Sequence, residues 1–386
     1  MPGEDQSGSA ADRADLVVAG GGLIGLACAL EAARDGHAVL VVDRGDGGRA
    51  SERAAGMIAP VGEASWGEEE LLAAALDSAG RWPAWAERLE ADSGLPVGYR
   101  RCGALHVGLD RDEAAELRRH HELHLELGLE SEWLTAGACR RLEPGLSTDV
   151  AGGFAAPGEA EVDPRSVVRA LRAACARAGV RLIDGRIAKV LVGPGGVARG
   201  LGLEGGRELR AGTVLLAAGA WIGALAPDGV EIPVRPVKGE IIRLRARPGE
   251  GPCERIVGAE RVYVVPRAGG EVVVGATVED RGFDVRVTAG GVHELLREAY
   301  RALPEVAELE LIGCEAGLRP TTPDNAPVIG WTAIEGLMVA GGHHRNGVLL
   351  TPLTAAAVAA LLRGDAAPGP VATLGPERFA ASGARR

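Results

Sequence analysis

The 386-residue sequence lacks the features of several specialised classes of protein. It has no excess of positive charge, because 42 Lys and Arg residues stand against 53 Asp and Glu residues and the net charge is −11. A nucleic-acid-binding protein needs a basic surface, so this balance argues against a nucleic-acid partner. The six cysteines are scattered without a C-x-x-C pair. This pattern favours reduced thiols in the cytoplasm over a disulfide framework or a thiolate metal site.

We expect no secretion signal, although residues 16–30 are apolar enough to suggest one. The residues before this stretch carry four acidic side chains against one arginine, whereas a signal peptide begins with a positively charged region. Four glycines inside the stretch make it a poor membrane helix. We therefore expect a cytoplasmic protein with no membrane association.

Glycine is abundant, with 58 residues, and three of these glycines carry the first functional motif. They are spaced G-x-G-x-x-G in the stretch ADLVVAGGGLIGLACALEAARDGHAVLVVDR, residues 14–44. An apolar strand precedes them, a helix is expected over residues 23–35, and a second apolar strand ends at Asp43. The order strand, glycine turn, helix, strand and acid predicts a dinucleotide-binding βαβ unit.

Each part of this unit has a physical task in holding a dinucleotide. Gly20 allows the tight turn, Gly22 lets the backbone approach a pyrophosphate, and Gly25 lets the helix pack closely on the strand. The N-terminus of the helix offers free N–H groups to the phosphates. Asp43 follows at the position where a carboxylate accepts hydrogen bonds from a ribose hydroxyl.

The rest of the chain predicts two domains that interrupt each other. Buried strands that end in glycine return at residues 212–219 and 339–342, and the latter is followed by a helix that we expect to begin after Gly347 and end near Leu362. From Ile232 the strands alternate apolar and polar residues, which indicates an antiparallel sheet with one wet face. We expect an α/β, Rossmann-like nucleotide domain, discontinuous in sequence, and an α+β substrate domain built on the antiparallel sheet. The expected ranges are 14–82, 145–231 and 317–364 for the first domain, 83–144 and 232–316 for the second, and 1–13 and 365–386 for the tails.

A charged helix expected over residues 113–127 holds His120 and His124, whose spacing would allow both to bind a metal from one helical face. The helix is rich in Glu and Arg, and no third ligand is evident. We therefore interpret it as a solvated helix and expect no metal.

Taken together, these blocks resemble the D-amino-acid-oxidase-like flavoprotein superfamily, and within it the glycine oxidases of thiamine biosynthesis. The resemblance covers about residues 14–364, and the order and spacing of five segments carry it. The motif GLRP followed by HHRNG resembles glycine oxidases and separates the sequence from most other members of the superfamily. The five segments are VVAGGGLIG, ASERAAGMIAP, PVKGE with YVVPR and VVVGATVE, AGLRPTTPDNAPVIG, and AGGHHRNGVLLTP.

The resemblance implies bound FAD and a set of residues that contact it. Those residues would be Gly20, Gly22, Leu23, Ile24, Gly25, Asp43, Arg44, Ser51, Gly56, Met57, Ile187, His343, His344, Arg345, Asn346, Gly347, Val348 and Leu349. Asp43 stands where the superfamily more often has Glu. Gly317 aligns with the flavin-linked cysteine of the monomeric sarcosine oxidases, and Cys314 lies three positions away, so the resemblance implies noncovalent FAD.

The resemblance also implies four residues that face the substrate. Arg319 would hold the substrate carboxylate as a bidentate pair, and Tyr263 would donate its hydroxyl to the same carboxylate. Arg345 would lie near the substrate and the flavin ring, and Met57 would help to wall the pocket. A structural salt bridge for Arg319 and a half-buried strand tyrosine for Tyr263 are the alternatives. Val278 replaces a methionine common in glycine oxidases, which leaves the substrate range open.

The implied activity is FAD-dependent oxidation of glycine or another small amino acid, such as sarcosine or a D-amino acid. Dioxygen would be reduced to hydrogen peroxide, and the amine would become an oxo acid and ammonia or methylamine. The family resemblance also implies a homo-oligomer, a tetramer. The alternatives are a D-amino-acid dehydrogenase or a sarcosine or proline oxidase of the same fold, an NAD-dependent dehydrogenase, and a flavin-bound assembly protein without turnover.

Overall fold

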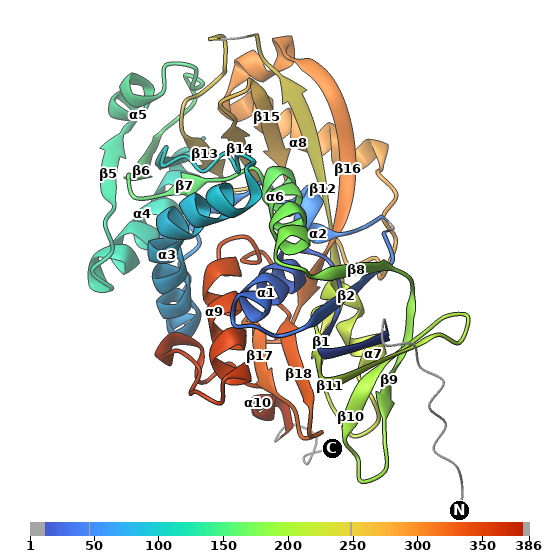
Figure 1. The fold of residues 1–386 in the computed structure, drawn as a ribbon. Coiled ribbons are helices and arrows are strands. Elements are labelled where there is room, and N and C mark those ends of the chain that lie inside the picture. The colour runs from blue at the N-terminus through green and yellow to red at the C-terminus, as the bar shows by residue number, and fades with distance from the viewer. Residues whose placement is uncertain (1–11, 46, 248, 381–386) are drawn as a thin grey trace, which may run out of the picture.

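The computed structural model describes residues 12–380, except 46 and 248 (Figure 1). Most of the predicted N-terminal tail, residues 1–11, lies outside the described residues. Arg13, the last residue of that predicted tail, already belongs to the first strand, where it pairs with Arg210.

The first sheet has a parallel core with the strand order β18-β11-β1-β2-β8, and β17 pairs antiparallel with β18 at its edge. A second branch, β9 and β10, pairs antiparallel with β11. This order confirms the predicted Rossmann-like fold, because β1 lies in a parallel sheet between β2, the next strand along the chain, and β11, and because β18 joins the sheet from the C-terminal part of the chain. The strands are β1 (Arg13–Ala19), β2 (Val39–Asp43), β8 (Arg181–Asp184), β9 (Ile187–Val192), β10 (Ala198–Leu203), β11 (Glu208–Leu216), β17 (Val328–Trp331) and β18 (Leu337–Gly341).

Helices and the β9–β10 branch cover the two faces of this sheet (Figure 1). One face packs against four helices, and their apolar side chains form the largest core cluster described. The other face packs against β9, β10 and the short helix α7 (Ile222–Leu225). The four helices are α1 (Leu23–Arg34), α3 (Glu69–Ser93), α6 (Pro164–Arg177) and α9 (Thr351–Leu362).

The second sheet has the strand order β16-β12-β15-β14-β13-β4-β6-β5, and every pair is antiparallel except β13 with β4. Helix α8 (Ala289–Ala302) packs against one of its faces. The strands are β4 (Ala104–Gly108), β5 (Glu132–Thr135), β6 (Gly152–Ala156), β12 (Arg235–Arg245), β13 (Ile256–Ala259), β14 (Val262–Pro266), β15 (Glu271–Gly275) and β16 (Glu310–Thr321).

The prediction that this sheet has one wet face is wrong. Its central strands are buried on both sides, because α8 covers one face and a large cavity shared with the first sheet lies against the other. Arg243, a polar residue of the alternating pattern, is only 2% exposed. Its guanidinium donates to Glu271 Oε1 at 2.6 Å and to the carbonyl of Glu52 at 3.0 Å, so an ion pair replaces water.

Two segments differ from the domain ranges expected from the sequence. Strand β6 falls in the range assigned to the nucleotide domain, yet it pairs with β4 and β5 in the second sheet. The predicted C-terminal tail contains helix α10 (Glu377–Ala380) and buries Val371, Leu374 and Phe379. These apolar side chains pack into the hydrophobic cores on the two faces of the first sheet. This packing holds residues 369–380 against that sheet.

The expected solvated histidine helix is also different in the structure. In α4 (Arg111–Glu126), His124 is fully buried and packs edge-on against Phe154, and burial lowers its pKa to about 4. His120 packs edge-on against Trp66. The histidine face of α4 therefore lies against the protein, and only its opposite face is solvated. The described residues hold no group of three or more His, Cys, Asp or Glu side chains placed to bind a metal.

The remaining elements are short connections between these layers. Among residues 12–380, no helix has both the length and the apolar character that a membrane span requires. The connecting elements are α2 (Ala50–Arg53), α5 (Ala136–Leu142), the 3-10 turns Gly219–Trp221, Pro304–Glu308 and Gly369–Val371, and the two-stranded pair β3 (Met57–Ile58) and β7 (Ala160–Glu161).

Candidate active site

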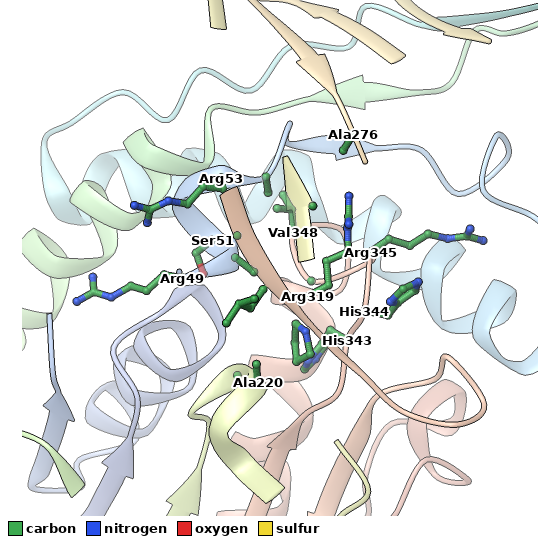
Figure 2. A pocket seen from close by; sticks show the side chains of 18 of the residues that line it. Arg49, Ser51, Arg53, Ala220, Ala276, Arg319, His343, His344, Arg345 and Val348 are labelled. Atoms are coloured by element: carbon green, nitrogen blue, oxygen red, sulfur yellow. The ribbon is translucent and has the colours of Figure 1, made fainter. Parts of the chain in front are cut away.

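A cavity of about 1330 Å³ lies between the carboxyl ends of the parallel strands and the second sheet, and its lining also reaches Gly291, Glu294 and Leu295 of α8. Figure 2 shows part of its wall, with side chains that come from segments far apart in the sequence. Every predicted site residue except Gly25 lines it. The predicted residues that do so are Gly20, Gly22, Leu23, Ile24, Asp43, Arg44, Ser51, Gly56, Met57, Ile187, Tyr263, Arg319, His343, His344, Arg345, Asn346, Gly347, Val348 and Leu349.

The glycine motif forms the turn between β1 and α1. Gly20 has φ +113°, and a Cβ there would overlap the carbonyl of Ala217. A Cβ at Gly25 would overlap the carbonyl of Gly20, so this glycine packs the helix onto the strand and does not reach the cavity. Leu23 N–H donates to Ser51 Oγ at 3.1 Å. Gly22, at the N-cap, has no side chain to cap the helix, which leaves the first turn open to an anion.

Asp43 ends β2 at the rim of the cavity, between two arginines that the sequence did not single out. Its Oδ1 accepts from Arg49 at 3.1 Å, and its Oδ2 accepts from Arg172 at 3.3 Å. The next residue, Arg44, places its guanidinium 3.7 Å from the ring centroid of Trp221, a cation–π contact. Asp43 is therefore oriented by cations while it lines the cavity.

Residues 343–350 form a turn that leads into α9, which begins at Thr351, after Gly347 as the sequence predicts. His343 is buried, its Nε2 lies 3.0 Å from Thr354 Oγ1, and burial lowers its pKa to about 3. Ser78 and Trp82 of α3 both donate to the carbonyl of Leu349, at 2.6 and 3.0 Å. These two donors fix the turn against the first core.

Arg319 and Tyr263 lie flat across glycines of neighbouring strands in the second sheet. A Cβ at Gly239 would overlap the Arg319 guanidinium, and a Cβ at Gly275 would overlap the Tyr263 ring. Arg319 Nη1 donates to the carbonyl of Thr277 at 3.0 Å and more weakly to that of Lys238 at 3.4 Å. Its other guanidinium nitrogens have no carboxylate partner in the described residues, which argues against the alternative of a structural salt bridge.

The ionisation of the groups beside Arg319 favours an anionic ligand. Burial raises the pKa of the Tyr263 phenol, and the Arg319 charge opposes that rise. Burial, together with three nearby arginines, lowers the pKa of His344 to about 4, and His344 Nδ1 lies 2.7 Å from Thr321 Oγ1. At neutral pH Tyr263 is thus a protonated donor and His344 is uncharged, so neither neutralises Arg319.

Arg345 lines the cavity but points away from Arg319, as Figure 2 shows. Its Nε forms an ion pair of 2.5 Å with Glu63, and its Nη2 lies 3.7 Å from Glu68. In this structure the positive charge of Arg345 is therefore paired with the carboxylates of the segment that follows β3.

The positions where the sequence departs from the family it resembles lie on the wall of the cavity or outside it. Val278 lines the cavity and is 73% exposed, so it forms part of the rim. Gly317 also lines the cavity, whereas Cys314, three residues earlier on β16, does not. No cysteine is among the lining residues that the structure describes.

These features fit a flavin dinucleotide. The open helix N-terminus and the glycine turn suit a pyrophosphate, and Asp43 suits a ribose. The cavity then continues past the turn at residues 343–349 to Arg319 and Tyr263, so a dinucleotide and a small carboxylate have adjoining places. The fold and this cavity define a nucleotide-dependent oxidoreductase with a separate sheet for its substrate.

Comparison with known proteins identifies the family. Residues 15–361 match the family described as FAD dependent oxidoreductase (DAO). Glycine oxidase of Geobacillus kaustophilus is 35% identical over 355 residues, which cover 91% of this chain and 93% of that protein. The crystal structure of that species' glycine oxidase superposes with a TM-score of 0.88 at 34% identity, covering 94% of this chain and 98% of the other. The chain belongs to this family of FAD-dependent oxidoreductases, and FAD is its cofactor.

A longer relative shows the same similarity. The bifunctional protein ThiO/ThiG of Trichormus variabilis is 35% identical over 347 residues, which cover 89% of this chain and 52% of that protein. The chain thus spans about half the length of the bifunctional relatives it matches.

Sequence reasoning missed Arg49, Arg172 and Trp221 on the nucleotide side, and His106 and Glu159 on the substrate side. The arginines lie in a loop and on a helix where a positive charge is unremarkable. His106 could have been suspected from glycine inside neighbouring strands, because such glycines mark places where another group approaches closely.

Proposed function

We propose that the chain oxidises glycine and other small amino acids, sarcosine and D-amino acids among them, with dioxygen as the electron acceptor. The observation that carries this proposal is the pair Arg319 and Tyr263 in the cavity. A guanidinium with free donors and a protonated phenol would bind a carboxylate. The similarity to glycine oxidases supports the same substrate class.

The residues of the chain act by binding and positioning. FAD, when bound, accepts the hydride that leaves the α-carbon of the amine. Arg319 and Tyr263 would fix the carboxylate and so orient the α-carbon, and the buried sheet behind them would exclude water. No side chain need act as a general base if the substrate enters as the free amine. The imine product would be hydrolysed to an oxo acid and ammonia or methylamine, and dioxygen would be reduced to hydrogen peroxide.

An anaerobic flavin-reduction screen tests the proposal. Glycine, sarcosine, D-alanine and D-proline would be mixed separately with the purified yellow protein, and loss of flavin absorbance would be recorded. Air would then be admitted and hydrogen peroxide measured. Bleaching by glycine followed by peroxide release is the expected result. Bleaching without peroxide would assign a dehydrogenase, and failure of all four amines would reject amine oxidation.

Further parts of the proposal extend to the cell. The similarity to glycine oxidases favours a role in thiamine biosynthesis, and we propose a cytoplasmic homo-oligomer, a tetramer, by the same resemblance. The domain ranges expected from the sequence also stay a prediction, except for β6 and residues 369–380, which the structure places elsewhere. Light scattering of the purified holoenzyme would give the number of copies.

A further inference from the structure

A third polar side chain, the imidazole of His106, lies on the same sheet face as Arg319 and Tyr263. Like them, it lies across a glycine of a neighbouring strand. His106 on β4 is opposite Gly258 on β13, Gly258 is opposite Tyr263 on β14, and Tyr263 is opposite Gly275 on β15. A Cβ at Gly258 would come within 2.6 Å of His106 Nδ1. The imidazole therefore lies across a glycine, as the phenol and the guanidinium do. Two strand spacings separate His106 from Tyr263, roughly 10 Å.

Glu159 lies beside His106 and also lines the cavity. Its side chain is fully buried, and its Oε1 accepts from the N–H of Gly62 at 2.5 Å. Its Oε2 has no hydrogen-bond partner among the described residues, and the same is true of His106 Nε2. The two atoms are 4.0 Å apart, which is too far for a hydrogen bond between them.

An unsatisfied buried carboxylate oxygen is costly, so this arrangement calls for a donor. A single nitrogen bearing several N–H groups could lie within hydrogen-bond distance of both atoms, because they are only 4.0 Å apart. An ammonium group has three such donors and carries a positive charge, which suits a buried carboxylate. Phe154 stacks on His106 with a centroid distance of 4.7 Å and holds the ring in place.

We propose that His106 and Glu159 form a second substrate subsite that binds a distal amino group of a diamino acid. This inference rests on the proposed function, since it takes Arg319 and Tyr263 as the site of the α-carboxylate. A substrate such as D-lysine would then lie along this sheet face, with its carboxylate on Tyr263 and Arg319 and its side-chain ammonium between His106 and Glu159. An extended lysine chain with a hydrogen bond at each end has a reach of the order of the separation between Tyr263 and His106.

The test compares three substrates of similar length with the holoenzyme. D-Lysine offers a distal ammonium, D-norleucine a methyl group, and D-2-aminoadipate a carboxylate. The expected order of kcat/KM is D-lysine, D-norleucine, D-2-aminoadipate, with D-lysine preferred over D-norleucine by about tenfold or more, the worth of a charge-assisted hydrogen bond. Anaerobic flavin reduction at varied substrate concentration would separate binding from the chemical step.

Three variants locate the preference. Glu159→Gln keeps the acceptor for Gly62 but removes the charge, and His106→Phe keeps a flat ring without nitrogen. Gly62→Ala places a methyl group that overlaps His106 Nε2 and Cε1, so the imidazole must move and the pair of acceptors is disrupted. Each should bring the ratio of D-lysine to D-norleucine close to one. Glu122→Gln, an exposed neutralisation on α4, is the matched control and should keep the ratio.

The outcomes separate this inference from the proposed function. Flavin reduction by glycine or D-alanine without a preference for D-lysine would overturn the subsite and leave the proposed function standing. A preference for D-lysine that survives Glu159→Gln and Gly62→Ala would also overturn the subsite. Failure of every amino acid to reduce the flavin would overturn both. If one variant loses its flavin, the other two still decide, because they alter different segments of the chain.

Discussion

Gly239→Ala should move the Arg319 guanidinium without touching the arginine itself. Gly239 is inside β12 and does not have a left-handed φ, so the backbone tolerates alanine. The added methyl carbon would lie 2.6 Å from Arg319 Cζ, and the three atoms nearest to it all belong to that side chain. Because this is the far end of a flexible side chain, Arg319 can give way while the strand keeps its pairing.

The displaced arginine should lose its paired hydrogen bonds to the substrate carboxylate. Hydrogen bonds to a charged group are worth about 1.5–3 kcal/mol, which corresponds to an increase in KM of roughly 10-fold to 150-fold. Stability should change by no more than about 1 kcal/mol, since alanine also lowers the entropy of the unfolded chain. KM should therefore rise strongly while the melting temperature and the flavin content hold.

The assay is peroxide release against glycine concentration, with flavin absorbance and thermal unfolding measured on the same samples. Gly313→Ala on β16 is the matched control, because a Cβ there meets nothing within 4 Å. The double variant Gly239→Ala with Arg319→Ala should be no worse than Arg319→Ala alone, since the clash has lost its partner. An unchanged KM in a flavin-loaded Gly239→Ala protein would refute the assignment of Arg319.

Three other substitutions test the ribose acceptor, the phenol and a buried histidine. Asp43→Ala removes the ribose acceptor and leaves Arg49 and Arg172 without it, so FAD should bind the apoprotein about tenfold or more weakly in a fluorescence titration; equal affinity would reject the ribose role. Tyr263→Phe removes one neutral donor, so the KM for glycine should rise about tenfold or less, and a larger effect than that of Arg319→Ala would contradict the view that Arg319 is the main carboxylate ligand. Burial lowers the pKa of His343 from 6.5 to about 3, so the unfolded chain binds a proton in this range that the folded protein does not. The free energy of unfolding should therefore fall from pH 6.5 toward pH 3, by up to roughly 1.4 kcal/mol per pH unit, and His343→Asn should flatten that slope in urea unfolding of the holoenzyme.

The nucleotide half of the site could be predicted from the sequence because its parts are local. Strand β1, the turn at Gly20, the start of α1 and the acid at the end of β2 all lie between Arg13 and Asp43, and strand and helix periodicity place them without any distant contact. The order and spacing of five segments, this motif among them, carried the family resemblance, and the resemblance implied the residues of the substrate side.

The tertiary structure decided which polar side chains are buried and which groups they pair with. The alternating strands from Ile232 indicate a wet face, but α8 and the cavity cover both sides, and Arg243 found acidic partners there. The histidines of α4 lie in a charged sequence, yet His124 packs inside against Phe154.

The sequence by itself therefore determined the dinucleotide unit, the class of fold and the chemistry expected of Arg319 and Tyr263, since each depends on neighbouring residues or on an ordered set of motifs. Only the tertiary structure brought β4 beside β13 and Glu159 beside His106. Strand order in a sheet depends on pairings between distant segments, and no local pattern records which strand will lie next to which. The proposed second subsite depends on that order.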